Sequence, residues 1–159
     1  ALNQLRAAVR AQSTSAAKKA PKVSELSIAQ VLKTTPGVFK ENAKNVVIKD
    51  LKRGNTRAGF PGVKAVAKDV FSKPGTRGRS HKCSIVAMDG KPVYLSKAAY
   101  FSCDCEAFLY WCEVALHAKG AAAIKFSNGE APDTRNPRKL PMICKHLIEL
   151  AYTCREHKF

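Results

Sequence analysis

Two short cysteine motifs constrain this chain more than any other feature of its sequence. Cys103 and Cys105 lie one residue apart in SCDCEAF, and MICKHLIEL repeats that spacing with Cys144 and His146. A disulfide between Cys103 and Cys105 would close a very tight, strained ring, and nothing in the sequence indicates an oxidising compartment. Two buried structural thiols are an alternative. In a strand, however, residues i and i+2 project from one face, so these thiols converge, and converging thiolates repel each other unless a cation lies between them.

Zinc supplies the required positive charge and prefers four sulfur or imidazole ligands in a tetrahedron. Within an α-helix, residues i and i+2 diverge by about 200°, so Cys144 and His146 cannot both face one ion from mid-helix. We therefore expect Cys144 just before the last helix and His146 in its first turn. The sequence predicts a Cys₃His zinc site whose two halves are separated by 38 residues. Its ligands are Cys103, Cys105, Cys144 and His146. Four protein ligands leave no position for water, so the zinc is expected to be structural rather than catalytic.

The first half of the chain is predicted to contain one short helix and one strand. Ser27 and Gln30 have the spacing of a capping box, which predicts a helix over residues 25–34 that TPG at 35–37 ends. NVVIKDL at 45–51 is typical of a strand. The flanking segments KDLKRGNTRAGFPG and SKPGTRGRSHK are predicted to be basic loops interrupted by glycine and proline.

The second half is predicted to be more regular. HKCSIVAM and KPVYLS flank Asp89-Gly90, which favours a hairpin with a type I′ turn. A strand through Tyr100 leads to the first cysteine pair. EAFLYWCEVALHAKG predicts a helix that Gly120 ends, and a final helix is expected to begin near Cys144.

The remaining cysteines and histidines favour structural roles. Cys112 and Cys154 fall on helix stripes and are expected to be core thiols. Cys83 and His81 share a strand face and could form a nucleophile and base, but no oxyanion-stabilising groups accompany them, so a half-buried strand cysteine is preferred. His117 could substitute as a metal ligand, yet its place at a helix end favours a surface histidine. We expect no enzymatic activity and no small-molecule substrate.

The chain is strongly basic, and its charge is unevenly distributed. Its net charge is +16, and residues 1–82 hold 18 Lys and Arg against 4 Asp and Glu, whereas residues 83–159 hold 10 against 8. Such basicity indicates a polyanionic partner, above all nucleic acid, because lysines that neutralise phosphates release condensed counterions. The alternatives are a solvated basic surface or an acidic protein partner. The residues expected to contact phosphates are Lys49, Lys52, Arg53, Arg57, Arg77, Arg79 and Lys82.

The pattern Cys-x-Cys followed by Cys-x-His resembles the SWIM zinc-finger family over roughly residues 80–152. All four ligand positions of that signature are filled, although the spacer is longer than in many members and is predicted to hold its own helix. The resemblance implies a ββα zinc module that binds DNA or proteins. The segments SCDCEAF, SNGEAP and CKHL also resemble small SWIM-type proteins encoded by large tailed bacteriophages, which implies a virion or phage nucleoprotein component.

Together these features predict an α+β chain with three regions. They are a basic N-terminal arm with a short helix (1–40), a basic Gly/Pro-rich strand-and-loop region (41–79) and a SWIM-like zinc module (80–159). The expected function is a zinc-binding module that contacts nucleic acid, protein or both within a larger nucleoprotein assembly. The alternative is a structural or adaptor subunit of a viral particle or multiprotein complex, with arms threading between neighbours. No apolar run approaches the roughly 18 residues that a membrane span needs, and no secretory signal is recognisable, so an intracellular reducing or virion location is expected.

Overall fold

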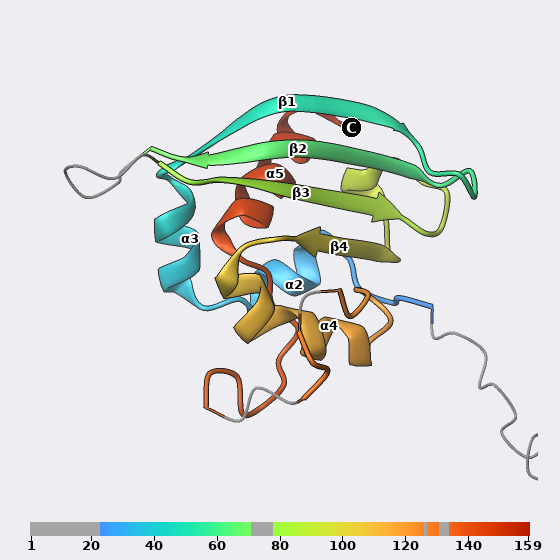
Figure 1. Ribbon diagram of the computed structural model, residues 1–159. Coiled ribbons are helices and arrows are strands. Elements are labelled where there is room, and N and C mark those ends of the chain that lie inside the picture. Colours follow the sequence, from blue (N-terminus) through green and yellow to red (C-terminus); the bar gives the residue numbers. More distant parts are fainter. Residues whose placement is uncertain (1–22, 71–77, 126, 131–133) are drawn as a thin grey trace, which may run out of the picture.

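A four-stranded antiparallel sheet forms the framework of the protein (Figure 1). The computed structural model describes residues 23–70, 78–125, 127–130 and 134–159. The strands lie in the sheet in the order of the chain: β1 (Val46–Asn55), β2 (Pro61–Asp69), β3 (Ser80–Ala87) and β4 (Ala99–Cys103). The α-helices are α2 (Ile28–Thr34), α3 (Gly37–Ala43), α4 (Glu113–Ala118) and α5 (Lys145–His157). The prediction of an α+β fold is confirmed, whereas residues 1–22 of the expected arm lie outside the described residues.

One face of the sheet is covered by α5 and forms the core. Burial alternates with a period of two along β2, β3 and β4, as expected for an antiparallel sheet with one covered face. The inward-facing side chains of these strands are Val63, Ala65, Ala67, Cys83, Ile85, Ala87, Ala99, Phe101 and Cys103. Helix α5 contributes Leu147, Ile148, Leu150, Ala151 and Cys154 to the same core cluster.

The opposite face of the sheet, which we call the outer face, carries the alternate residues of the strands. Its lysines on the three strands from β1 to β3 are Lys49, Lys52, Lys64, Lys68 and Lys82. The same face carries Val66, Ser84, Val86, Tyr100 and Ser102, all of which are half-buried. Val47, which lies opposite Lys68, is exposed on this face as well. The outer face therefore combines lysines and serines with valines and one tyrosine, in contrast to the apolar inner face.

The N-terminal helices belong to the folded body. Ser27 caps α2 through the predicted capping box, because its side chain accepts from the N–H of Gln30 at 3.2 Å and the Gln30 side chain accepts from the N–H of Ser27 at 2.7 Å. Helix α2 buries Ile28, Val31 and Leu32. A second helix, α3, follows directly after Pro36, where the sequence predicted only an end to the first. Proline is tolerated at the start of a helix because the first N–H groups have no intrahelical partner, so TPG separates two helices.

Strand β2 replaces part of a predicted loop. Residues 56–60 form a tight turn in which the N–H of Thr56 donates to the carbonyl of Phe60, and Gly59 adopts φ 88°. β1 and β2 pair on either side of this turn, with a bulge between Lys49 and Lys52. β2 also pairs with β3, so strands from both sides of the expected boundary at residue 79 lie in a single sheet.

The predicted hairpin at Asp89-Gly90 is wrong. KPVYLS forms no strand but contains the 3-10 turn η1 (Val93–Leu95), and β3 pairs with β4 instead. The carboxylate of Asp89 explains the difference, because it accepts hydrogen bonds from Ser96 Oγ and from the N–H of Lys97, both at 2.9 Å. These contacts fold the segment after the turn back on itself instead of extending it along β3.

The helix predicted over residues 106–120 is irregular. A π-helical turn, η2 (Phe108–Cys112), precedes α4, and Gly120 follows with φ 71°, which confirms the predicted end at this glycine. None of the helices in the described part of the chain is long and apolar enough to cross a membrane.

Candidate metal centre

The two cysteine motifs meet at one end of the sheet. Cys103 is the last residue of β4, Cys105 follows one residue later, Cys144 is the N-cap of α5 and His146 lies in its first turn. Their four ligand atoms lie within 4.8 Å of one another, and all four side chains are buried. The Nδ1 atom of His146 is 3.9 Å from the sulfur of Cys103 and 4.0 Å from that of Cys144. The predicted convergence is therefore confirmed as a possible metal site.

Local backbone geometry explains why both halves can face one point. Cys144 has an extended backbone (φ −75°, ψ 167°) and precedes the helix, which is the arrangement that the i, i+2 spacing requires. Cys103 lies directly opposite Cys83 in the β3–β4 ladder. Beyond it the chain turns into a helix, since the N–H of Leu109 donates to the carbonyl of Cys105 at 3.1 Å. This turn brings Cys105 back towards the start of α5.

The cluster matches the dimensions of a tetrahedral zinc site. Zinc binds sulfur at about 2.3 Å and nitrogen at about 2.0–2.1 Å, so tetrahedral ligands are separated by about 3.6–3.8 Å. The sulfur–nitrogen distances of 3.9 and 4.0 Å in the cluster are close to these values. Three thiolates and one imidazole are also a ligand set that zinc prefers.

The pKa values of the three cysteines indicate why a cation suits this site. Hydrogen bonds from Cys103 and Cys144 lower the pKa of Cys105 far below its ordinary value. The hydrogen bond with Cys105 raises the pKa of Cys103, and burial raises that of Cys144. Without a cation, ionisation of Cys103 or Cys144 would bury a further negative charge next to Cys105. A divalent cation removes this repulsion and allows all three sulfurs to ionise.

A carboxylate orients the histidine of the cluster. The Nε2 atom of His146 donates to Oδ1 of Asp69 at 3.0 Å, which leaves Nδ1 free to face the sulfurs. Lys145 contacts the same oxygen at 3.1 Å. Burial alone would raise the pKa of Asp69, but the hydrogen bonds from Lys145 and His146 outweigh it and lower that pKa. Asp69 thus stays ionised and fixes the ring of His146, as in the common carboxylate–histidine arrangement of metal sites.

We expect Asp69→Asn to weaken zinc binding by about 10–100-fold, which is the usual effect of removing a carboxylate behind a histidine ligand. The asparagine keeps the size of the side chain but loses the charge that makes the imidazole a stronger ligand. Competition with a chromophoric chelator of known affinity measures the change. Asp50→Asn is the matched control, because Asp50 is exposed on β1 and contacts none of the four ligands. Equal zinc affinities for the two variants would exclude a role for Asp69.

His81 lies beside the centre. Its ring centroid is 4.6 Å from that of His146, and its Nδ1 donates to Asp104, the residue between the first two cysteines, at 3.1 Å. Asp69, His81 and His146 form a second group of possible ligands. Because this group shares His146, whose Nδ1 faces the sulfurs, we regard it as part of the surroundings of the same centre.

The other cysteines and His117 take structural positions. Cys112 and Cys154 are buried in the core, as predicted. Cys83 is also buried, its sulfur lies 3.7 Å from the carbonyl of Ala65, and burial raises its pKa to about 12. Such a thiol is protonated at neutral pH and is a poor nucleophile. His117 is exposed at the end of α4, where its Nδ1 donates to the carbonyl of Ala122 at 2.9 Å.

The residues predicted to contact phosphates are divided among several places. Lys49, Lys52 and Lys82 lie on the outer face, on strands rather than in loops. The guanidinium of Arg53 lies 4.3 Å from the centroid of the Phe159 ring, next to the core. The rest of the set consists of Arg57 in the β1–β2 turn, Arg79 next to β3 and 3.9 Å from Glu106, and Arg77 outside the described residues.

The prediction missed Lys64 and Lys68, which share the outer face with the other lysines. The alternation of apolar and polar residues in PGVKAVAKD is the signal that could have found both, because it is typical of a half-buried strand.

Comparisons of the chain with models of protein families, with curated proteins and with solved structures find no match. The Cys/His cluster supports metal binding, but such a cluster by itself does not identify the SWIM family. The strands β3 and β4 and the helix α5 surround the cluster within a larger four-stranded sheet.

Proposed function

We propose that this protein is a non-enzymatic module stabilised by a structural zinc ion, and that it binds nucleic acid through phosphate contacts within a larger nucleoprotein assembly. The observation that carries the proposal is the buried cluster of Cys103, Cys105, Cys144 and His146. When bound, zinc would supply the charge that holds three thiolates together. It would also join the end of β4 to the start of α5.

The burial of the cluster supports a structural metal. The exposed fractions of its four side chains lie between 0% and 3%. Catalytic zinc sites keep three protein ligands and an open position for water or substrate, whereas structural sites are closed by four protein ligands. A site with four buried ligands fits the structural class.

Charge supports nucleic acid as the partner. The chain has a net charge of +16, and five lysines lie on the outer face of the sheet. Lysines that approach phosphates release condensed counterions, which makes binding favourable and dependent on salt. The resemblance to SWIM-type proteins is consistent with such a role.

We expect the affinity of the zinc-loaded full chain for a fluorescein-labelled 20-base-pair DNA to fall steeply with salt. If about four lysines contact phosphates, log K changes with log salt with a slope of about −3.6, so affinity falls about 100-fold between 50 and 200 mM salt. Fluorescence anisotropy measures this slope. An affinity that is weak and independent of salt, together with co-purification in fixed stoichiometry with a particle, would instead support the structural or adaptor role.

A further inference from the structure

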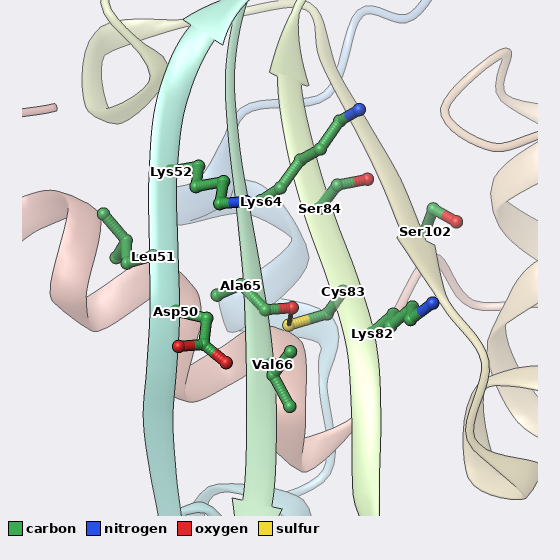
Figure 2. A pocket seen from close by; sticks show the side chains of 10 residues that line it. All are labelled: Asp50, Leu51, Lys52, Lys64, Ala65, Val66, Lys82, Cys83, Ser84 and Ser102. Atoms are coloured by element: carbon green, nitrogen blue, oxygen red, sulfur yellow. Dashed lines mark hydrogen bonds between the residues drawn. The ribbon is translucent and has the colours of Figure 1, made fainter.

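A row of polar side chains crosses the outer face from β1 to β4. In the register of the sheet, Lys52 lies opposite Lys64, Lys64 lies opposite Ser84, and Ser84 lies opposite Ser102. Figure 2 shows these side chains on four neighbouring strands. Neighbouring strands are about 4.8 Å apart, so the row places the backbone positions of two lysines and two serines along a line of roughly 14 Å.

The row contains an unfavourable pair. Lys52 and Lys64 face each other directly, and like charges at directly opposite positions destabilise a sheet. Both side chains are exposed, and Lys49, Lys68 and Lys82 add further positive charge on the same face. An anion bound between the two lysines would remove their repulsion.

The same residues line a depression of about 520 Å³ on the sheet. Lys52, Lys64 and Lys82 surround it, together with the hydroxyls of Ser84 and Ser102 (Figure 2). Two carboxylates lie at or near its edge. Asp50 belongs to the lining, whereas Asp104 accepts hydrogen bonds from His81 and from the N–H of Lys82, each at 3.1 Å. Leu51, Ala65, Val66 and Cys83 complete the lining, so three lysines and two hydroxyls surround a largely apolar depression.

We propose that the outer face of the sheet binds the sugar–phosphate backbone of nucleic acid, with Lys52 and Lys64 at the centre of the contact. This inference rests on the proposed nucleic-acid function and names the surface that performs it. The ammonium groups of the lysines donate to phosphate oxygens, and the hydroxyls of Ser84 and Ser102 donate to neighbouring ones. Hydroxyl and lysine side chains are common donors to phosphates in nucleic-acid complexes.

The composition of the face favours nucleic acid over an acidic protein. The central parts of protein–protein interfaces are depleted in lysine and enriched in aromatic residues, methionine and arginine. The outer face has the opposite composition, with five lysines and one aromatic residue, Tyr100, along the described strands. Base edges are read mainly by arginine, asparagine and glutamine in bidentate contacts. A face of lysines and serines should therefore bind backbone without sequence preference.

Lys64→Glu is a test that separates binding from folding. The new carboxylate lies opposite Lys52, so an attractive cross-strand pair replaces a repulsive one, and the thermal unfolding temperature is expected to stay the same or to rise. Affinity for nucleic acid is expected to fall at least about tenfold at 100 mM salt, because one phosphate contact is lost and a negative charge is added. The double variant Lys52→Glu/Lys64→Glu is expected to lose about 100-fold.

The probes are labelled 20-nucleotide single-stranded DNA and its 20-base-pair duplex, with poly-glutamate as an acidic polypeptide. Lys33→Glu and Lys119→Glu are matched controls, since both lysines are exposed and belong to helix α2 and the end of α4. Each is expected to change the affinity by about twofold or less.

The outcomes distinguish the surface from the function. A loss confined to Lys64→Glu and the double variant, on either DNA probe, supports the outer face. An equal loss in the controls would overturn this surface while leaving nucleic-acid binding intact. No binding of either DNA by the unaltered protein would overturn the proposed function itself. Tighter binding of poly-glutamate than of DNA would replace nucleic acid with an acidic protein as the partner.

Discussion

Cys144→Ser is expected to abolish zinc binding and to leave the protein largely unfolded at 25 °C. Serine is close to cysteine in size, but its hydroxyl does not ionise to a ligand at neutral pH. In zinc-finger peptides, the apparent binding free energy of structural zinc is roughly 10–16 kcal/mol. The free energy of unfolding of a whole domain is roughly 5–15 kcal/mol. Loss of the metal therefore removes free energy comparable to the entire stability.

The substitution at Cys144 also isolates the effect of the metal from that of the helix end. Cys144 is the N-cap of α5, and its side chain makes no capping hydrogen bond. Serine is among the preferred N-cap residues, so the substitution should favour the start of α5 locally. Unfolding in spite of an improved cap would identify the missing metal ligand as the cause.

Cys154→Ser is the matched control, because Cys154 is equally buried in the same helix but lies outside the metal cluster. It is expected to cost about 1–3 kcal/mol, through a buried hydroxyl, and to retain one zinc ion per chain. Atomic emission spectrometry and far-UV circular dichroism measure metal content and fold. Native circular dichroism in a verified metal-free protein would show that the fold does not depend on zinc.

Phe101→Ala is expected to reduce the free energy of unfolding by about 3–5 kcal/mol, the usual range for removing a buried aromatic side chain. Phe101 lies on the inner face of β4 opposite Ile85, and both side chains have an exposed fraction of 0%. The truncated side chain would leave a cavity between the sheet and α5. Phe101 precedes Cys103 by two residues on the same strand. Urea unfolding in zinc-saturated buffer measures the change, so that metal occupancy is equal in all variants.

Tyr100→Ala is the control for Phe101→Ala on the same strand. Tyr100 is the preceding residue, lies on the outer face and is half-buried. Its truncation removes a side chain of similar size with less loss of burial, and a cost of about 1 kcal/mol is expected. Equal losses for the two variants would contradict the assignment of inner and outer faces.

The features predicted correctly depend on residues that are close in the sequence. Ser27 and Gln30 form the capping box, Gly120 ends the α4 region, and Cys144 lies just outside α5 with His146 in its first turn. Each of these features follows from the geometry of three or four neighbouring residues, so it can be predicted from the local sequence alone. The meeting of the two motifs was also predictable, because the chemistry of zinc limits how three thiols and an imidazole can be satisfied.

The errors concern segments whose structure depends on distant partners. PGVKAVAKD becomes β2 because the strands on both sides pair with it. KPVYLS does not become a strand because the carboxylate of Asp89 accepts hydrogen bonds from the side chain of Ser96 and from the N–H of Lys97. Glycine and proline at 54–61 suggested a loop, yet Gly54 lies in β1 and Pro61 in β2, and a short turn joins these two long strands. Local propensity for strands is weak enough that such pairing decides the outcome.

The sequence by itself indicated the candidate ligand set, the excess of positive charge and the helix ends, because each depends on residue type or on neighbours within one turn. Only the tertiary structure decided that Asp69 supports His146 across 77 positions of the chain, and that Lys52 and Lys64 face each other on a single surface. The physical reason is that strand register is set by burial of one whole face of the sheet. Contacts such as that between Asp69 and His146 therefore depend on the tertiary structure and not on separation along the chain.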